Sequence, residues 1–221
     1  MTREAYQRSL KELEADVLAM GAMVKEAVRN SISSLQTRDI AESKKLIAND
    51  ILINRKRFDI EDRCLQIIAT QQPMAGDLRV LAATLNIITD LERIADHAEG
   101  NAQINVLIGN EELVKPLIDI PRMVEFAIKM LDDALTAFVT RDEEKAKAVC
   151  AEDDKVDALY EHIYRELILI MIEDPKKIKG ATYLMWAAHN LERIADRATN
   201  IAERVIYTVS GKMEELNVSR Y

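Results

Sequence analysis

The hexapeptide Leu-Glu-Arg-Ile-Ala-Asp occupies residues 91–96 and recurs unchanged at residues 191–196. A second match lies upstream, where the tripeptide Thr-Arg-Asp stands at residues 37–39 and again at residues 140–142. The copies are 100 and 103 residues apart, so both matches have nearly the same offset. Identical segments at corresponding places indicate an internal duplication. The sequence therefore predicts two copies of one structural unit in tandem.

Apolar residues recur at spacings of three and four along most of the chain, which is the period of an α-helix. The second predicted helix, for example, carries Leu46, Ile53 and Ile60 on one stripe. Glycine and proline, which break helices, number only six and four. A helix of 33 residues is about 50 Å long, and such helices joined by tight turns pack as antiparallel bundles. The predicted segments are residues 3–36, 39–71, 74–107, 121–139, 142–173 and 176–209.

The prolines mark where these segments begin and end. Pro73 and Pro175 are expected at helix starts, where the missing N–H costs nothing. Pro116 and Pro121, together with Gly109, mark a central linker. The fold class is therefore all-α, with six long antiparallel helices in two tandem three-helix bundles.

Domain boundaries follow from the same breaks. We expect a first bundle over residues 1–108, a linker over residues 109–120 and a second bundle over residues 121–221. Within each bundle the repeated tripeptide ends in an aspartate, Asp39 or Asp142, and aspartate is a favoured N-cap.

Composition excludes several classes of protein. The 221 residues carry 30 Lys and Arg against 38 Asp and Glu, a net charge of −8, which argues against a nucleic-acid partner. The longest purely apolar run, residues 167–172, is far shorter than the about 20 residues of a spanning helix. The charged N-terminus has no apolar signal segment, so a cytoplasmic protein is expected, peripheral to the membrane at most. Cys64 and Cys150 are expected to be reduced thiols, and Trp186 to fill the core.

The repeated hexapeptide contains a pair of acids on one helix face. Glu92 and Asp96 are four residues apart, and Glu192 and Asp196 repeat the arrangement. The second helix of each bundle carries a similar pair. If the second and third helices face each other, oxygen-bearing side chains converge in each half. The candidate metal ligands are Asp50, Asn54, Glu92 and Asp96 in the first half, and Asp153, Asp157, Glu192, Asp196 and Asn200 in the second.

Glu92 and Glu192 continue apolar stripes that should face the bundle interior or its edge. Burying such a charge is costly without a partner, so the pairs must be exposed, salt-bridged or bound to a cation. Oxygen ligands suit iron, manganese, magnesium or zinc. Arg93 and Arg193 could instead neutralise the acids. The di-iron motif Glu-x-x-His is missing, although His189 could border a metal site.

The repeated hexapeptide and the residues around it resemble the PhoU family of phosphate-uptake regulators. The resemblance rests on Asp-Leu-Glu-Arg-Ile-Ala-Asp at residues 90–96 and on the related stretch at residues 190–203. Asp-Leu-Arg at residues 77–79 fits as well, as do the acidic turns at Asp50 and Asp153. The resemblance spans nearly the whole chain.

The resemblance implies two three-helix bundles related by pseudo-twofold symmetry, in a cytoplasmic and commonly homodimeric protein. It implies negative regulation of the high-affinity phosphate ABC transporter, by contact with its ATPase subunit. It also implies contact with the phosphate-sensing histidine kinase, which is kept in its phosphate-replete signalling state. The implied cofactor is multinuclear iron or zinc, absent from some members.

Two departures from the pattern affect the first half. Asn54 replaces a carboxylate, and Gly100 stands where the second half has Asn200. We therefore expect the second half to bind metal more tightly. Two alternatives stay open: a metal-free helical adaptor, and a multinuclear-metal oxidase or phosphoesterase. The enzyme is disfavoured because the sequence offers no evident histidine ligand or acid–base partner.

Overall fold

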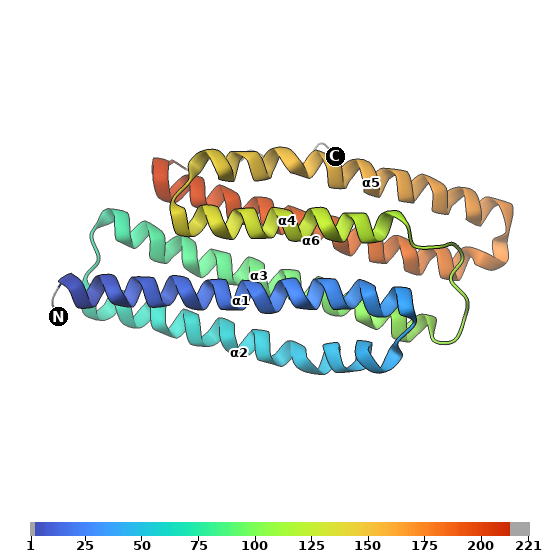
Figure 1. Ribbon diagram of the computed structural model, residues 1–221, viewed down its shortest axis with the longest axis horizontal. Coiled ribbons are helices and arrows are strands. Elements are labelled where there is room, and N and C mark those ends of the chain that lie inside the picture. The colour runs from blue at the N-terminus through green and yellow to red at the C-terminus, as the bar shows by residue number, and fades with distance from the viewer. Residues whose placement is uncertain (1–2, 213–221) are drawn as a thin grey trace.

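The computed structural model describes residues 3–212, and this part of the chain is helical with no strand (Figure 1). The all-α prediction with six long helices is confirmed. A short 3₁₀ turn, η1, spans Pro175–Lys177. The helices are α1 Arg3–Thr37, α2 Ile40–Gln71, α3 Ala75–Ile108, α4 Asp119–Thr140, α5 Glu143–Glu173 and α6 Ile178–Ser210.

The helices form two three-helix bundles that lie side by side. Helices α1, α2 and α3 pack on one another, as do α4, α5 and α6. The bundles meet where α1 contacts α4 and where α3 contacts α6, so that α2 and α5 run along opposite outer edges (Figure 1). No helix in the described range 3–212 is both long and apolar enough to cross a membrane.

The repeated tripeptide builds the same turn in both bundles. Arg38 and Arg141 have positive φ angles of 61° and 57°, which end the first helix of each bundle. The carboxylate of Asp39 then accepts a hydrogen bond of 2.9 Å from the backbone N–H of Glu42. Asp142 does the same with the N–H of Lys145, also at 2.9 Å. The predicted N-caps are confirmed.

Two expectations need correction. Helix α4 begins at Asp119, two residues before the predicted start, so the last two residues of the predicted linker are helical and Pro121 is the third residue of the helix. Proline is tolerated there because the first N–H groups of a helix have no intrahelical acceptor. Trp186, expected in the core, is 51% exposed. Two neighbouring residues of α6 make the nearby contacts: Asn190 donates to Asn101 of α3, and the ring of His189 contacts that of Tyr160 of α5. Trp186 lies on the helix face between these two contacts, so neither α3 nor α5 covers it.

The contact between α3 and α6 shows the internal symmetry at the level of side chains. Arg197 donates to Asp90 at 3.3 Å across this interface. At the equivalent positions with the two helices exchanged, Nδ1 of His97 on α3 lies 3.4 Å from Oδ1 of Asn190 on α6. Asp90 and Asn190 precede the two copies of the hexapeptide. The repeated segments therefore form the junction between the bundles as well as carrying the acidic pairs.

Candidate metal-binding sites

The acidic site of the first bundle lies between α2 and α3. One carboxylate oxygen from each of Asp50, Asp96 and Glu99 lies within 4.8 Å of the other two, and all three residues are half-buried. Asn54 donates to Asp50 at 2.7 Å, one turn along α2. The structure therefore brings together Asp50 and Asp96 as predicted, and adds Glu99. Its position three residues after Asp96, on the same helix face, was the signal in the sequence that could have identified it.

The carboxylates of this site repel one another. Burial raises the pKa of Asp50, and the nearby charges of Glu99 and Asp96 raise it further, against the hydrogen bond from Asn54. Glu92 is not among the three converging residues; Nε of Arg93 lies 3.6 Å from its carboxylate. Three mutually repelling carboxylates form an attractive site for a cation, which would relieve the repulsion.

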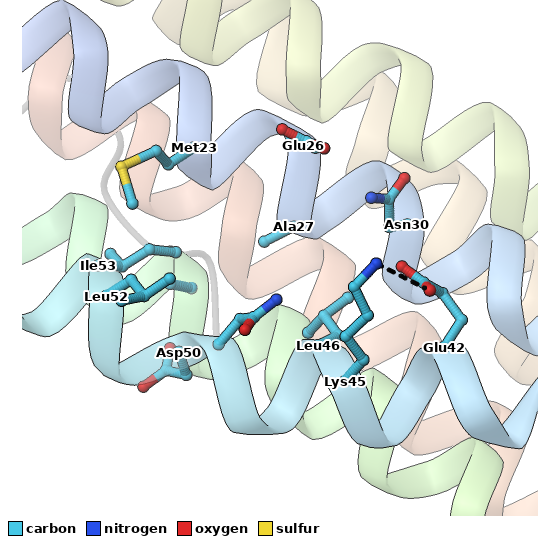
Figure 2. A pocket seen from close by; sticks show the side chains of 12 residues that line it. Met23, Glu26, Ala27, Asn30, Glu42, Lys45, Leu46, Asp50, Leu52 and Ile53 are labelled. Carbon is cyan, nitrogen blue, oxygen red and sulfur yellow. Dashed lines mark hydrogen bonds and ion pairs between the residues drawn. The ribbon is translucent and has the colours of Figure 1, made fainter.

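Figure 2 shows a cavity between α1 and α2 that reaches this site, with a volume of about 190 Å³. Asp50 stands on its rim, and its carboxylate points away from the α1 side chains Met23 and Ala27. An ion pair of 3.4 Å joins Lys45 to Glu42 at the other end. The cavity lies beside the acidic cluster, and Asp50 belongs to both.

The acidic site of the second bundle is more deeply buried. Asp153 on α5 and Glu192 on α6 are only 3% and 4% exposed. Oε2 of Glu192 is inaccessible and accepts no hydrogen bond from residues 3–212. Nδ1 of His189 lies 3.4 Å from this oxygen, within range of an ion pair but without the geometry of a hydrogen bond. His189 thus borders the site.

Burial dominates the electrostatics of this second site. It raises the pKa of Glu192 to about 7, and the charges of Asp196, Asp157 and Asp153 add to the effect, against Arg193. Burial and Asp196 also raise the pKa of Asp157. The charges of the other three carboxylates thus act on Glu192, but within the described chain no three of the four have oxygens all within 4.8 Å of one another.

The structure places Asn200 at the junction of the bundles. Its side chain interacts with Asp90 across the α3–α6 interface and opposes the rise that burial causes in the pKa of that carboxyl. At the equivalent position, a Cβ added to Gly100 would come within 3.0 Å of Nδ2 of Asn190. The difference between Gly100 and Asn200 is thus explained by contacts between the bundles. The assignment of Asn200 as a metal ligand stays a prediction.

A third group of side chains that could bind a metal lies between α4 and α5 and consists of Asp119, His162 and Glu166. Its carboxylates already have cationic partners: Arg122 lies 2.9 Å from Asp119, and Lys115 pairs with Glu166. Positive charge from the protein itself satisfies this group.

The candidate ligand atoms of the two interhelical sites are oxygens, and one imidazole lies at the border of the second site. Such a set fits a hard or borderline cation, as iron, manganese and magnesium are. The buried oxygen of Glu192, which accepts no hydrogen bond within the described range 3–212, fits a cation in particular. A bound ion would neutralise the acids and link the second helix of each bundle to the third.

Two tandem three-helix bundles, each with acids from its second and third helices facing one another, define a class of helical proteins with duplicated acidic sites. The model of the PhoU domain matches residues 17–104 and again residues 120–205. The chain belongs to the PhoU family, and thus to the accessory and regulatory proteins of phosphate transport.

Relatives and solved structures agree along almost the whole chain. A phosphate-specific transport system accessory protein PhoU homolog of Clostridium acetobutylicum is 37% identical over 98% of this chain and 100% of its own length. A homolog of Aquifex aeolicus is 37% identical over 93% of each chain. The crystal structure of PhoU from Pseudomonas aeruginosa has a TM-score of 0.88 at 33% identity, covering 94% of this chain and 100% of that one. The phosphate transport system regulatory protein PhoU from Streptococcus pneumoniae has a TM-score of 0.89 at 28% identity, with 96% and 100% covered.

Proposed function

We propose that this chain is a negative regulator of phosphate uptake that acts as a cytoplasmic homodimer through protein contact. The main support for this proposal is the match to the PhoU domain in both halves of the chain. The proposed partners are the ATPase subunit of the high-affinity phosphate ABC transporter and the phosphate-sensing histidine kinase. A net charge of −8 suits docking on basic protein surfaces and not on nucleic acid or anionic lipid.

The regulatory role is tested in cells and with purified proteins. Deletion of the gene should make a phosphate-starvation reporter constitutively active in phosphate-rich medium, and the full chain should restore repression. The purified chain should bind the immobilised ATPase subunit and the cytoplasmic part of the kinase. A deletion strain that still represses the reporter would contradict the proposal.

We further propose that the regulator binds multinuclear iron or zinc at both acidic sites. The ligands would be Asp50, Asp96 and Glu99 in the first half, and the four carboxylates of the second-half candidate set in the other. The support is the convergence of acids between two helices in each bundle, and the buried oxygen of Glu192. The ion would supply positive charge that holds the second and third helices together.

Elemental analysis of tag-free protein, purified without chelator, tests the metal. The double variant Asp153→Ala/Glu192→Ala should lose the metal of the second half and keep that of the first. A matched control, Glu144→Ala/Glu161→Ala, removes two exposed acids of α5 and should keep the full content. Unchanged metal content in the first variant would show that these ligands are wrong.

The metal-free adaptor is the second candidate, because arginines already pair with the acids. Arg93 lies 3.1 Å from Asp96, and Arg193 lies 2.6 Å from Asp196. In this case the thermal midpoint should not respond to added metal or to chelator, whereas a bound metal would raise it.

A further inference from the structure

The outer edge of α2 carries an apolar stripe that the fold does not use. Ile51, Phe58 and Leu65 are 54%, 58% and 52% exposed. They are seven residues apart, which places them on one line along the helix, here called the outer ridge of α2. Within the described chain α2 contacts only α1 and α3, and it runs along an outer edge of the molecule (Figure 1). Because the three residues are exposed, neither neighbour covers the ridge.

The second bundle has no such ridge at the equivalent positions. At the offset of 103 residues, the equivalents of the three ridge residues on α5 are Asp154, Glu161 and Ile168. The two acids are exposed and Ile168 is half-buried. The fold is therefore built equally well with charges at these places. Apolar residues at these three places are specific to α2, whereas α5 exposes Tyr164, Leu169 and Ile172 nearer its end. Exposed apolar surface of this kind marks interaction sites.

Charges around Phe58 change sign along the helix. Arg55, Lys56 and Arg57 precede it, and Asp59, Glu61 and Asp62 follow it. Lys56 pairs with Asp16 at 2.6 Å and Arg57 with Glu61 at 3.4 Å. Arg55 and Asp59, by contrast, are exposed and form no ion pair or hydrogen bond with another residue of the described range.

This pattern is complementary to itself in one orientation only. When two copies of α2 cross antiparallel with Phe58 near the twofold axis, the basic turn of each copy lies opposite the acidic turn of the other. Arg55 of one copy then faces Asp62 of the other, twice, and Ile51 approaches Leu65. A parallel pair would set like charges against each other.

We infer that the outer ridge of α2 is a self-association surface, on which a second copy of this chain packs antiparallel. The inference rests on the dimeric state proposed above and names the face that forms it. One helix pair gives an interface at the small end of the known range, so the dimer should dissociate at micromolar concentration.

Sedimentation velocity of the full chain over a concentration series tests the surface. Phe58→Glu should raise the dimer dissociation constant by at least about tenfold, as loss of a central aromatic contact does. Phe58 is exposed, so circular dichroism should show an unchanged helix content. The control is Leu169→Glu, which changes an apolar residue of α5 that is 59% exposed and should leave the dissociation constant unchanged.

Charge reversal tests the orientation. Arg55→Glu and Asp62→Arg should each weaken the dimer, and the double variant should restore it, since opposite charges face each other again. A wild-type chain that stays monomeric at all concentrations, or a dimer that Phe58→Glu leaves unchanged, overturns the inference. Binding to the ATPase subunit is measured on the same variants: a monomer that still binds leaves the regulatory proposal intact, whereas a dimer that does not bind contradicts only that proposal.

Discussion

The two bundles share one plan of helices but bury different groups at the same places. In the first, Nδ2 of Asn105 donates to the carbonyl of Ser34 and to the hydroxyl of Ser43, both at 2.9 Å and all buried. In the second, the equivalent positions hold Ala137, Ala146 and Val205, all fully buried. One packing site therefore accepts either a hydrogen-bonded network or apolar side chains.

The acidic sites of the two bundles also differ, in how deeply their carboxylates are buried and how closely they converge. The first is half-buried, and three of its carboxylates converge. The second has two nearly inaccessible acids, Asp153 and Glu192, but its oxygens are spread more widely. Duplication has therefore preserved the acids of the third helix of each bundle, while their burial depends on neighbours that have diverged.

The largest effect is expected from breaking the polar network of the first bundle. Asn105→Val, which introduces the residue of the second bundle, should lower the free energy of unfolding by roughly 3 kcal/mol. The buried Ser43 hydroxyl loses its donor, and the Ser34 carbonyl keeps only the backbone N–H of Asp39. Urea unfolding followed by circular dichroism measures this change.

The triple variant Ser34→Ala/Ser43→Ala/Asn105→Val is the control, since it converts the whole site to the apolar form. It should recover most of the loss, because replacing all partners together leaves few buried groups unsatisfied. Equal stability of the single and the triple variants would show that the network is not a coupled unit.

A second effect should appear in the pH dependence of metal-free protein. The pKa of Glu192 is raised to about 7, above the about 4.3 of an unfolded glutamate, so the folded chain binds more protons between these values. The free energy of unfolding should therefore fall as pH rises from about 4.5 to about 7, by on the order of 2 kcal/mol from this residue. Denaturant titrations in chelator at several pH values measure it.

Glu192→Gln should remove this part of the pH dependence. The matched control in the other bundle is Glu92→Gln; the side chain of Glu92 is 18% exposed against 5% for that of Glu192. Equal pH profiles for wild type and Glu192→Gln would contradict the difference between the two acidic sites.

A third, smaller effect concerns the contact of α1 with α4. A Cβ added to Gly21 would lie 2.3 Å from Cδ1 of Leu135, whereas the equivalent residue of α4 is Val124. Gly21→Ala should lower the thermal midpoint and cost about 1 kcal/mol, because overpacking exceeds the gain in helix propensity. The control Gly76→Ala has no atom within 4 Å and should be neutral or stabilising. A stabilised Gly21→Ala would show that Leu135 yields freely.

The smallest effect is expected where the bundles use one ion pair with reversed polarity. Glu12 on α1 pairs with Arg63 on α2, and at the offset of 103 residues Lys115, in the connection before α4, pairs with Glu166 on α5. Lys115→Glu should cost less than about 1 kcal/mol, and adding Glu166→Arg should return stability to within about 0.5 kcal/mol of wild type. Thermal unfolding at low salt measures both. Two independent, additive effects would disprove the pairing.

The sequence predicted the helices because their period and caps are local properties. Apolar spacing identified the buried stripe with Ile53 and Ile60, and the aspartates at positions 39 and 142 begin α2 and α5 as caps. It also placed Asp96 on the face of α3 that meets Asp50. It missed Glu99, because helical spacing allows several neighbouring positions to reach the same site, and packing selects among them.

The number of helices, the duplication and the family can be read from the amino-acid sequence, since these depend on periodicity and on residues close along the chain. The convergence of three carboxylates, the contact of Asn200 with Asp90 and the exposure of Trp186 follow only from the packing of the helices. The physical reason is that a helical period fixes the face of a side chain, while its burial and its partners depend on how neighbouring helices are set against that face.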